Sequence, residues 1–343
     1  MEPVTGLDAH TPVRRRRVLS HAVCTAALAC ALAGCLQQAE MESVDAERQK
    51  PVQRIDNFLA AAGNGNSVVI AGIGGVLVSA DKSQKWLRQQ LPAPSSVVGI
   101  ATCKDRTFVA LDFYSKVWLG SADGRNWDSR PIPADFNPVA ITCDDKGGFW
   151  VVGSRTNVLS SSDRGQNWKR SNLHKDAILT SVQFTDASHG FITGEFGTIA
   201  ASVDGGETWK ELPALPNEFY PFSTLFTDSM HGWSTGLGGV TLYTENGGLS
   251  WSRQLTPTPR QVYALAPINE MVIGVGAGGQ IVSFDATSWS PIPAAPDLHG
   301  DLNALSSIAG RVAIAAGGWG SVQGFEVAAD GTDFGAIPDT HSR

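Results

Sequence analysis

The sequence predicts an all-β protein, a seven-bladed β-propeller of four-stranded antiparallel blades joined by one repeated kind of turn. Three observations lead to this prediction. A short motif with an aromatic end recurs seven times, and its aromatic ends lie 38 to 45 positions apart. A period near 40 residues built of short strands is typical of propellers and solenoids. The 343 residues include 37 glycines and only 17% charged residues, which suits short strands and tight turns.

The N-terminal residues 1–34 have the pattern of an export signal. Arg14 to Arg17 are basic, residues 18–33 are mainly apolar, and the stretch ends in Leu32-Ala33-Gly34-Cys35. This ending resembles the bacterial lipobox, in which a peptidase cleaves before the cysteine and the thiol carries diacylglycerol. We therefore expect residues 1–34 to be a lipoprotein signal peptide and Cys35 to be lipidated. An ordinary secretory signal that contains a cysteine is the alternative.

Residues 35–53 are polar and mostly acidic after the cysteine, so we expect a tether between the lipid and the folded domain. Leu36 follows Cys35, and the absence of Asp there favours the outer membrane. We expect the protein on the periplasmic side of that membrane, or in the thylakoid lumen of a phototroph. No other segment has the 18 apolar residues that suggest a membrane-spanning helix.

The charge of the chain limits its partners. The formal net charge is −7, and outside the signal there is no basic run. An acidic chain without a basic patch is a poor candidate for nucleic-acid binding. We expect a monomer without a cofactor that is bound to the membrane through its lipid.

The repeated motif reads S/T-x-D/N-x-G-x-x-W and resembles the Asp-box, or BNR repeat. Six copies keep the acid or amide and the tryptophan. They are Asp81, Asp123, Asp163, Asp204, Asn246 and Asp285, followed by Trp86, Trp127, Trp168, Trp209, Trp251 and Trp289. A seventh, decayed copy runs from Ala329 to Phe334. The repeats place the propeller at residues 54–338, with 339–343 as a tail.

A physical role explains each position of the motif. The Asp or Asn oxygen accepts backbone N–H groups across a tight turn. The glycine adopts a positive φ that other residues avoid. The tryptophan lies on the next strand and buries its ring between neighbouring sheets. These residues are therefore interpreted as structural rather than catalytic.

A second repeated turn precedes two of the motifs. It reads D-x-x-H-G in both blades and contains His189 and His231. Because the histidines occupy identical places, we interpret them as turn residues and expect no metal site. Glycine-rich corners such as 72–75 and 236–239 follow, so each blade reads strand, turn, strand, corner, strand, Asp-box, strand.

The cysteines that remain after the signal are Cys103 and Cys143, in similar positions of two adjacent blades. An exported protein can form disulfides. Equivalent positions of neighbouring blades usually lie beyond the roughly 7 Å Cα separation that a disulfide tolerates. We therefore predict two buried free thiols. Blade 7 is expected to supply its own fourth strand, Phe334 to Ile337.

The combined pattern of corners, D-x-x-H-G turns and Asp-boxes resembles the photosystem II stability and assembly factor family. The resemblance implies a seven-bladed propeller that binds a membrane-protein partner. In phototrophs such proteins act on the lumenal side and assist insertion of a reaction-centre protein. These relatives bind through a basic surface, whereas this chain is acidic. Similar propeller lipoproteins also occur in bacteria that do not photosynthesise.

The topology assigns the loops to two faces of the disc. The Asp-boxes and strand 1–2 turns share one face and are uniform. The strand 2–3 corners and strand 4–1 crossovers share the other face and vary from blade to blade, as functional loops do. The candidate partner-binding residues on this face are Tyr114, Lys116, Arg155, Phe196, Phe219, Tyr220, Arg260 and Trp319. In the alternative reading, Phe219, Phe222 and Trp319 fold back into the core.

Two other functions compete with an accessory factor. Sialidases and some glucan hydrolases share the Asp-box, but hydrolysis needs two carboxylates, or a tyrosine nucleophile with an acid. The segment Arg130-Pro131-Ile132-Pro133 directly follows a box and lacks the sialidase context, so we predict no enzyme. A glycan or cell-wall binding module that uses aromatic residues such as Phe219 and Tyr220 is the other alternative.

Overall fold

The structure is a computed structural model of the chain. It describes residues 42–83, 85–133, 135–285, 287–293, 298 and 300–327. The chain forms two compact units, Met1–Gln49 and Lys50–Arg343. Cys35, the signal and the seventh motif at 329–334 lie outside the described residues.

The described part of the first unit is one short helix, α2 (Glu42–Gln49). It lies inside the segment expected to be a tether. Six of its eight residues are polar, and Arg48 lies 3.8 Å from Asp45 one turn earlier. Within the described residues, no helix has the length and apolar character needed to cross a bilayer.

The second unit consists of seven antiparallel sheets, as predicted. Blades 1 to 4 contain β1 (Phe58–Gly63), β2 (Ser67–Gly72), β3 (Val76–Asp81) and β4 (Trp86–Gln90); β5 (Val97–Thr102), β6 (Phe108–Asp112), β7 (Lys116–Gly120) and β8 (Trp127–Pro131); β9 (Pro138–Cys143), β10 (Phe149–Gly153), β11 (Asn157–Ser161) and β12 (Lys169–Asn172); and β13 (Leu179–Phe184), β14 (Gly190–Gly194), β15 (Ile199–Ser202) and β16 (Lys210–Glu211).

Blades 5 to 7 follow the same order of strands. They contain β17 (Pro221–Phe226), β18 (Gly232–Gly236), β19 (Thr241–Thr244) and β20 (Ser252–Gln254); β21 (Val262–Ile268), β22 (Met271–Gly276), β23 (Ile281–Phe284) and β24 (Trp289–Ile292); and β25 (Leu302–Ile308), β26 (Val312–Gly317) and β27 (Val322–Glu326). Blade 7 therefore shows three strands in the described residues. Its predicted fourth strand, 334–337, lies outside them.

The sequence of each strand matches its depth in the ring. The second strand of a blade is buried along its whole length, as in β2 and β10, because neighbouring blades cover both of its faces. These strands are rich in Val, Ile and aromatic residues, which pack well on pleated surfaces. The outermost strands, such as β12, are polar and mainly exposed.

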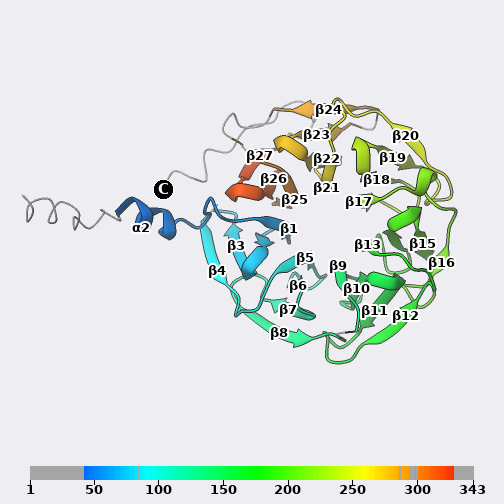
Figure 1. The fold of residues 1–343 in the computed structure, drawn as a ribbon, viewed down its shortest axis with the longest axis horizontal. Helices are drawn as coiled ribbons and strands as arrows, with labels where there is room; N and C mark the ends of the chain where they lie inside the picture. The colour runs from blue at the N-terminus through cyan, green and yellow to red at the C-terminus, as the bar shows by residue number, and fades with distance from the viewer. Residues whose placement is uncertain are drawn as a thin grey trace, which may run out of the picture. The chain divides into compact units, whose positions relative to one another are not determined.

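The blades form a ring in which β1 lies beside β25 (Figure 1). One apolar cluster spans this junction and contains Phe58 of blade 1 and Ile314 of blade 7. Backbone hydrogen bonds reinforce it, since Gly320 N donates to Asp56 O at 2.8 Å. Val52, assigned to the tether from the sequence, is only 3% exposed within this cluster. The compact unit thus begins slightly before the expected boundary at residue 54.

The prediction of two free thiols at Cys103 and Cys143 is wrong, because these residues form a disulfide with a Cα–Cα distance of 5.1 Å. Cys103 directly follows β5 and Cys143 ends β9, the innermost strands of blades 2 and 3. Innermost strands converge on the ring axis, so equivalent positions lie much closer there than further out in the blade. The separation falls within the range for disulfides.

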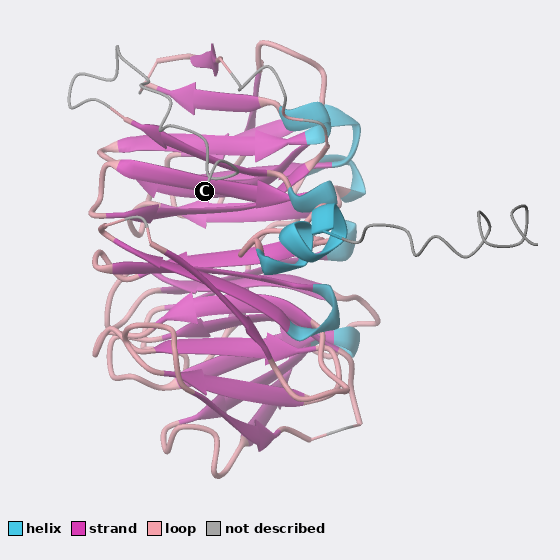
Figure 2. Cartoon of the chain, turned by 90° about the vertical axis from the view of Figure 1, so that its left-hand side faces the viewer, coloured by secondary structure: helices cyan, strands magenta, loops and turns pink. Residues whose placement is uncertain are grey.

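The turns divide the propeller unit into two faces, as the predicted topology requires. The 3₁₀ turns that connect second and third strands lie together on one side of the disc (Figure 2). They are η1 (Ile73–Gly75), η2 (Ser154–Thr156), η3 (Glu195–Gly197), η5 (Leu237–Gly239), η6 (Ala277–Gly279) and η7 (Gly318–Gly320); η4 (Pro216–Glu218) lies in the crossover from blade 4 to blade 5. We call this side the corner face and the opposite side the box face.

Candidate functional site

Each Asp-box on the box face is closed by hydrogen bonds of its own turn. In blade 4, Ser202 Oγ donates to Asp204 Oδ1 at 2.7 Å, and Gly206 N donates to Ser202 Oγ at 2.8 Å. Thr208 donates its hydroxyl and its backbone N–H to the same carboxylate at 2.6 and 3.0 Å. These bonds, led by the hydroxyl, lower the pKa of Asp204 to about 2.

The other boxes use their acids in the same way. Asp163 accepts the backbone N–H of Gln166 and Asn167, and its pKa is lowered to about 2, chiefly by the bonds from Asn167. Asn246 accepts the backbone N–H of Ser250 at 2.9 Å. The oxygens of these carboxylates and of the Asn246 amide therefore accept hydrogen bonds from the backbone of their own turns.

The box glycine joins each turn to the preceding blade. Gly206 has φ 88°, and a Cβ there would lie 2.3 Å from the Trp150 ring of blade 3. Gly248 has φ 87° and lies against Ile199 of blade 4. Only glycine combines this conformation with so close an approach.

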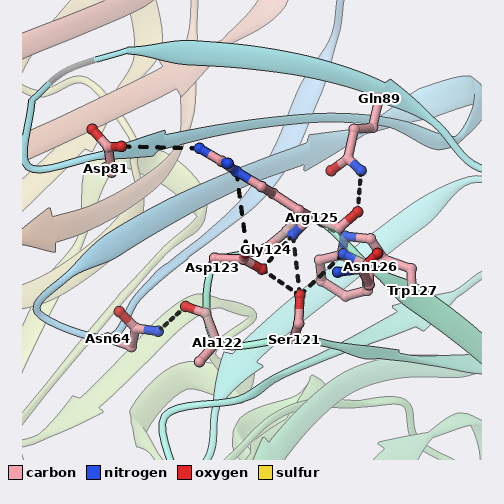
Figure 3. A network of polar contacts seen from close by, with 10 residues as sticks. All are labelled: Asn64, Asp81, Gln89, Ser121, Ala122, Asp123, Gly124, Arg125, Asn126 and Trp127. Atoms are coloured by element: carbon pink, nitrogen blue, oxygen red, sulfur yellow. Dashed lines mark hydrogen bonds and ion pairs between the residues drawn. The ribbon is translucent and has the colours of Figure 1, made fainter.

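Boxes of neighbouring blades are also linked by polar contacts, shown for blades 1 and 2 in Figure 3. Arg125 reaches Asp81 of blade 1 and Asp123 of its own box, each at 4.0 Å. Asn64 Nδ2 donates to Ala122 O at 2.7 Å. The box face is therefore organised for stability of the ring.

The two predicted histidine turns have the same internal geometry. His189 Nδ1 lies 2.8 Å from Asp186 Oδ2, and His231 Nδ1 lies 2.8 Å from Asp228 Oδ2. Each aspartate also accepts the backbone N–H of its histidine at 2.8 Å. Within the described residues, no group of three His, Cys, Asp or Glu side chains is placed to hold a metal.

The corners on the opposite face share one backbone shape. The glycine that ends the second strand lies against the backbone just before the first strand of the same blade. In blade 1, a Cβ on Gly72 would lie 2.0 Å from Asn57 O. The middle residue then has a left-handed conformation. Glycine occupies this place in η1, η5 and η6, but Arg155, Phe196 and Trp319 occupy it in η2, η3 and η7, at φ 53°, 56° and 58°.

The predicted partner-binding residues divide into exposed and engaged ones. Tyr114, Phe196 and Trp319 are 50%, 61% and 76% exposed, and Arg155 and Arg260 are exposed as well. Lys116 is half-buried, because its Nζ donates to Pro94 O at 2.6 Å and lies 5.1 Å from the centre of the Trp118 ring. Trp319 does not fold back into the core.

Phe219 does not lie on the surface as predicted. It is 7% exposed and packs in an apolar cluster with Leu215 and Phe226. The left-handed residues Asn217 and Glu218 turn the chain just before it, which directs its ring inward. Its neighbour Tyr220 is half-buried.

A pocket of about 310 Å³ opens between blades 4 and 5 at the corner face. Its walls are Pro216, Asn217, Glu218, Phe219, Tyr220, Leu237, Val240, Leu242 and Arg253. The floor is thus apolar, and Glu218 and Arg253 supply charge. Burial, helped by Glu195, raises the pKa of Tyr220, so its hydroxyl is a neutral hydrogen-bonding group at physiological pH.

Tyr220 also begins a row of half-buried rings on two first strands. Its ring centre lies 6.0 Å from that of Phe222, which lies 5.4 Å from that of Tyr263 in the next blade. Both contacts are edge-to-face, a favoured geometry for aromatic pairs. The row gives this part of the face rigid apolar surface with hydroxyl groups.

Sequence reasoning missed several exposed residues of the corner face. Ile73 and Leu237 are the first residues of their corners and are more than half exposed, and Ile55 before β1 is more exposed still. Arg54 and Arg253 are also exposed there. A signal was available, because a large apolar residue placed between glycines in a predicted corner has little core to enter.

Comparison with known proteins identifies the family that this geometry resembles. Residues 168–292, which span blades 4 to 6, match the family model described as photosynthesis system II assembly factor YCF48. No curated protein matches the chain significantly.

Solved structures share the propeller fold. A structure of YCF48 bound to a D1 peptide is 13% identical, has a TM-score of 0.66, and covers 82% of this chain and 94% of that chain. YCF48 from Cyanidioschyzon merolae is 14% identical, with a TM-score of 0.64 and coverage of 79% and 96%. Virginiamycin B lyase from Staphylococcus aureus is 14% identical, with a TM-score of 0.68 and coverage of 79% and 94%.

The resemblance to this family that the sequence predicted is confirmed over residues 168–292. The match to blades 4 to 6, together with seven blades of the expected order, makes the chain a photosystem II assembly factor-like propeller. The similar solved structures include both binding proteins and lyases, so at these identities they show the fold alone.

Proposed function

We propose that this photosystem II assembly factor-like propeller is a non-catalytic accessory factor of the cell envelope that binds a membrane-protein partner with its corner face. One observation carries the proposal. Among the described residues, the exposed aromatic side chains all lie at the corners (Phe113, Tyr114, Phe196 and Trp319), whereas the acids of the Asp-boxes are used in turns. Rigid aromatic residues and arginines on variable loops are the usual anchors of protein interfaces.

The nature of the matched family supports a membrane protein as the partner. The family model is that of an assembly factor, and one propeller of the same fold was solved with a D1 peptide. In a phototroph, we propose a photosystem II reaction-centre protein as the partner. In other bacteria, the same face binds another envelope complex.

The pocket between blades 4 and 5 is the proposed anchor point for the partner. Its volume of about 310 Å³ lies at the lower end of the range of ligand pockets and accommodates one or two large side chains. Leu237, Val240 and Leu242 provide apolar contact, and Arg253 provides a cation at the rim. The pocket therefore suits an apolar side chain of the partner next to an acidic one.

A lipid on Cys35 is proposed to hold the propeller at the membrane of its partner. The basic segment, the apolar stretch and the Leu-Ala-Gly-Cys ending support this anchor. The lipidated monomer is then proposed to lie on the periplasmic side of the outer membrane, or in the thylakoid lumen of a phototroph.

The chemistry of the repeated Asp-box turns supports a role without catalysis. The carboxylates of Asp163 and Asp204 accept several hydrogen bonds, and their low pKa keeps them ionised at neutral pH. A general acid needs the opposite shift, towards neutral pH.

Crosslinking in membranes followed by affinity capture and mass spectrometry tests the proposal. The combined change Tyr114→Ala, Tyr220→Ala and Trp319→Gly is expected to abolish recovery of the partner. The matched control, Val203→Ser with Leu249→Ser, removes two exposed apolar residues of the box face and is expected to leave recovery unchanged. Equal recovery with both sets of changes would refute binding by the corner face.

Glycan binding is a second candidate, favoured by the row Tyr220, Phe222 and Tyr263. Partly exposed rings of this kind can pack against sugar faces, and the tyrosine hydroxyls can hydrogen-bond to them. Retention of the protein on a peptidoglycan column, lost on Tyr263→Ala and unaffected by the box-face control, would favour this function. Absence of retention, with a captured membrane protein, excludes it.

A further inference from the structure

Every blade presents one prominent side chain at its corner. Ile73 and Leu237 are the first residues of their corners, Arg155, Phe196 and Trp319 are the middle ones, and Tyr114 tops the hairpin of blade 2. The corner of blade 6 is bare, but Arg260 covers it from the crossover, with Nη1 3.0 Å from the position of a Cβ on Gly278. We call these residues the tip ring: Ile73, Tyr114, Arg155, Phe196, Leu237, Arg260 and Trp319.

Three members of the tip ring retain an unfavourable backbone. Arg155, Phe196 and Trp319 have φ between 53° and 58°, a region in which side chains other than glycine are strained. Glycine takes the same place in three other corners. A large residue in a left-handed conformation at an exposed apex adds nothing to the core, which points to a use for the side chain outside the fold.

The charges of this face differ from those of the chain as a whole. Although the net charge is −7, the guanidinium groups of Arg54, Arg253 and Arg260 have no hydrogen-bond or ion-pair partner among the described residues. Among the residues that the structure describes, the Arg155 guanidinium donates one hydrogen bond, to the carbonyl of Asp135 at 3.1 Å.

Most acids of the face are already occupied. Glu195 accepts the backbone N–H of Ile178, and Asp301 accepts that of Gly278, both at 2.8 Å. Glu218 and Asp176 are exposed carboxylates. All four carboxylates keep their charge and equal the arginines in number, but the tip ring itself contains Arg155 and Arg260 and no acid, so the charges of the tip ring attract an anionic surface.

The propeller chain also enters on this face. Asp56 O accepts the N–H of Gly320 in η7, and Asn57 O accepts that of Ile73 in η1. Ile55, directly before them, is 80% exposed. The chain that precedes β1 therefore enters the propeller unit on the same face as the tip ring.

We propose that the corner face lies on an anionic phospholipid bilayer, with the tip ring seated among the headgroups. The tips stand at or beside the corners of all seven blades, although they do not occupy one equivalent position, and they are therefore distributed around the whole face, as a planar partner requires. A single peptide would fill a groove and leave most of the ring unused. Aromatic and aliphatic side chains mixed with arginine are typical of the membrane interface, and unpaired arginines are attracted to anionic lipid.

Vesicle flotation tests this proposal without any protein partner. The chain from residue 35 onward, with Cys35→Ser, contains the complete unit that begins at Lys50 and carries its own apolar clusters. It is mixed with vesicles of phosphatidylcholine alone or with phosphatidylglycerol added. We expect flotation with the anionic vesicles, reduced by high salt because screening weakens the attraction of exposed charges.

The decisive variant is Phe196→Gly with Trp319→Gly, because glycine already stands at this position in other corners. We expect its vesicle binding to fall by about tenfold or more. Val203→Ser with Leu249→Ser on the box face should bind as the wild type does. Arg54→Gln with Arg260→Gln should lose the preference for phosphatidylglycerol.

Two results would overturn the proposal. One is that the wild-type protein does not float with anionic vesicles. If partner capture then succeeds, the corner face is a protein interface only. The other is equal binding by the glycine variant and the box-face control. Because no partner is present in this experiment, its failure is distinct from failure of the proposed function.

Discussion

Phe196 and Trp319 occupy the same position in blades 4 and 7, each as the left-handed middle residue of its corner, at φ 56° and 58°, with an exposed ring. Gly74, Gly238 and Gly278 hold that position elsewhere. The fold therefore accepts glycine at this position, and the two rings can be removed with little harm to the core. Changes of Phe196 and Trp319 to glycine can therefore test partner binding without a large change in the stability of the fold.

Replacing both rings by glycine should leave the unfolding free energy nearly unchanged. Relief of the left-handed strain, about 1 kcal/mol per residue, offsets the greater backbone entropy of glycine in the unfolded chain, about 0.5–1 kcal/mol. Urea unfolding of Phe196→Gly with Trp319→Gly measures the balance. Val203→Gly, at an exposed site with ordinary backbone, is the control and should lose about 0.5–1 kcal/mol. A loss of several kcal/mol in the double variant would mean that these rings support the fold.

Gly206→Ala should destabilise the ring more than its conformation alone predicts. The new Cβ meets the buried Trp150 ring at 2.3 Å, so we expect a loss of about 2–4 kcal/mol. Gly65→Ala is the matched control, because Gly65 also has a positive φ, 82°, but no atom within 4 Å. Thermal unfolding of both variants separates the cost of the clash with Trp150 from the cost of an alanine at positive φ. Equal losses of unfolding free energy would contradict the contact between position 206 and Trp150.

The disulfide should stabilise the folded protein, because it closes a loop and thereby lowers the entropy of the unfolded chain. Cys103 and Cys143 are 40 residues apart, and a closed loop of that length gives about 4 kcal/mol in the entropy model. Cys103→Ala with Cys143→Ala should lower the urea midpoint, and a reductant should have the same effect on the wild type only. If the reductant leaves the wild-type midpoint unchanged, the crosslink does not stabilise the ring.

The Asp-boxes should make stability depend on acid pH. The pKa of Asp204 is about 2 in the folded protein, below its ordinary value of 3.8. Its contribution is complete above the ordinary value and is lost as the pH falls through the folded value. Asp204→Asn, which copies Asn246 in blade 5, should flatten the dependence of unfolding free energy on pH between about 4 and 2. An unchanged slope would show that this carboxylate is not specially stabilised.

The repeat made the fold and its two faces predictable, because each motif position has a local physical cause. The turn at Asp204 needs an acceptor, and Gly206 needs a positive φ beside a large ring. Such requirements repeat with every blade and can be read without knowing what lies opposite. The resemblance to the assembly factors depended on the same local pattern.

Contacts between blades were harder to predict. The disulfide depends on the distance between β5 and β9 near the ring axis, and this distance cannot be derived from the spacing of the repeats in the sequence. The inward direction of Phe219 depends on the left-handed conformation of Asn217 and Glu218. Neither residue is a glycine, so the sequence does not indicate a left-handed turn there. The exposure of Ile73 and Leu237 was not predicted, because the glycine pattern of a corner fixes its backbone turn but not the direction of the apolar side chain beside the glycines.

Site-specific photocrosslinking in the native membrane tests the central claim most directly. A photoreactive phenylalanine analogue is placed at Trp319 on the corner face or at Val203 on the box face, both among the most exposed positions. Our account predicts a defined adduct with an envelope membrane protein from position 319 and none from position 203. Adducts from position 203 alone, or the same adducts from both positions, would contradict a binding role for the corner face.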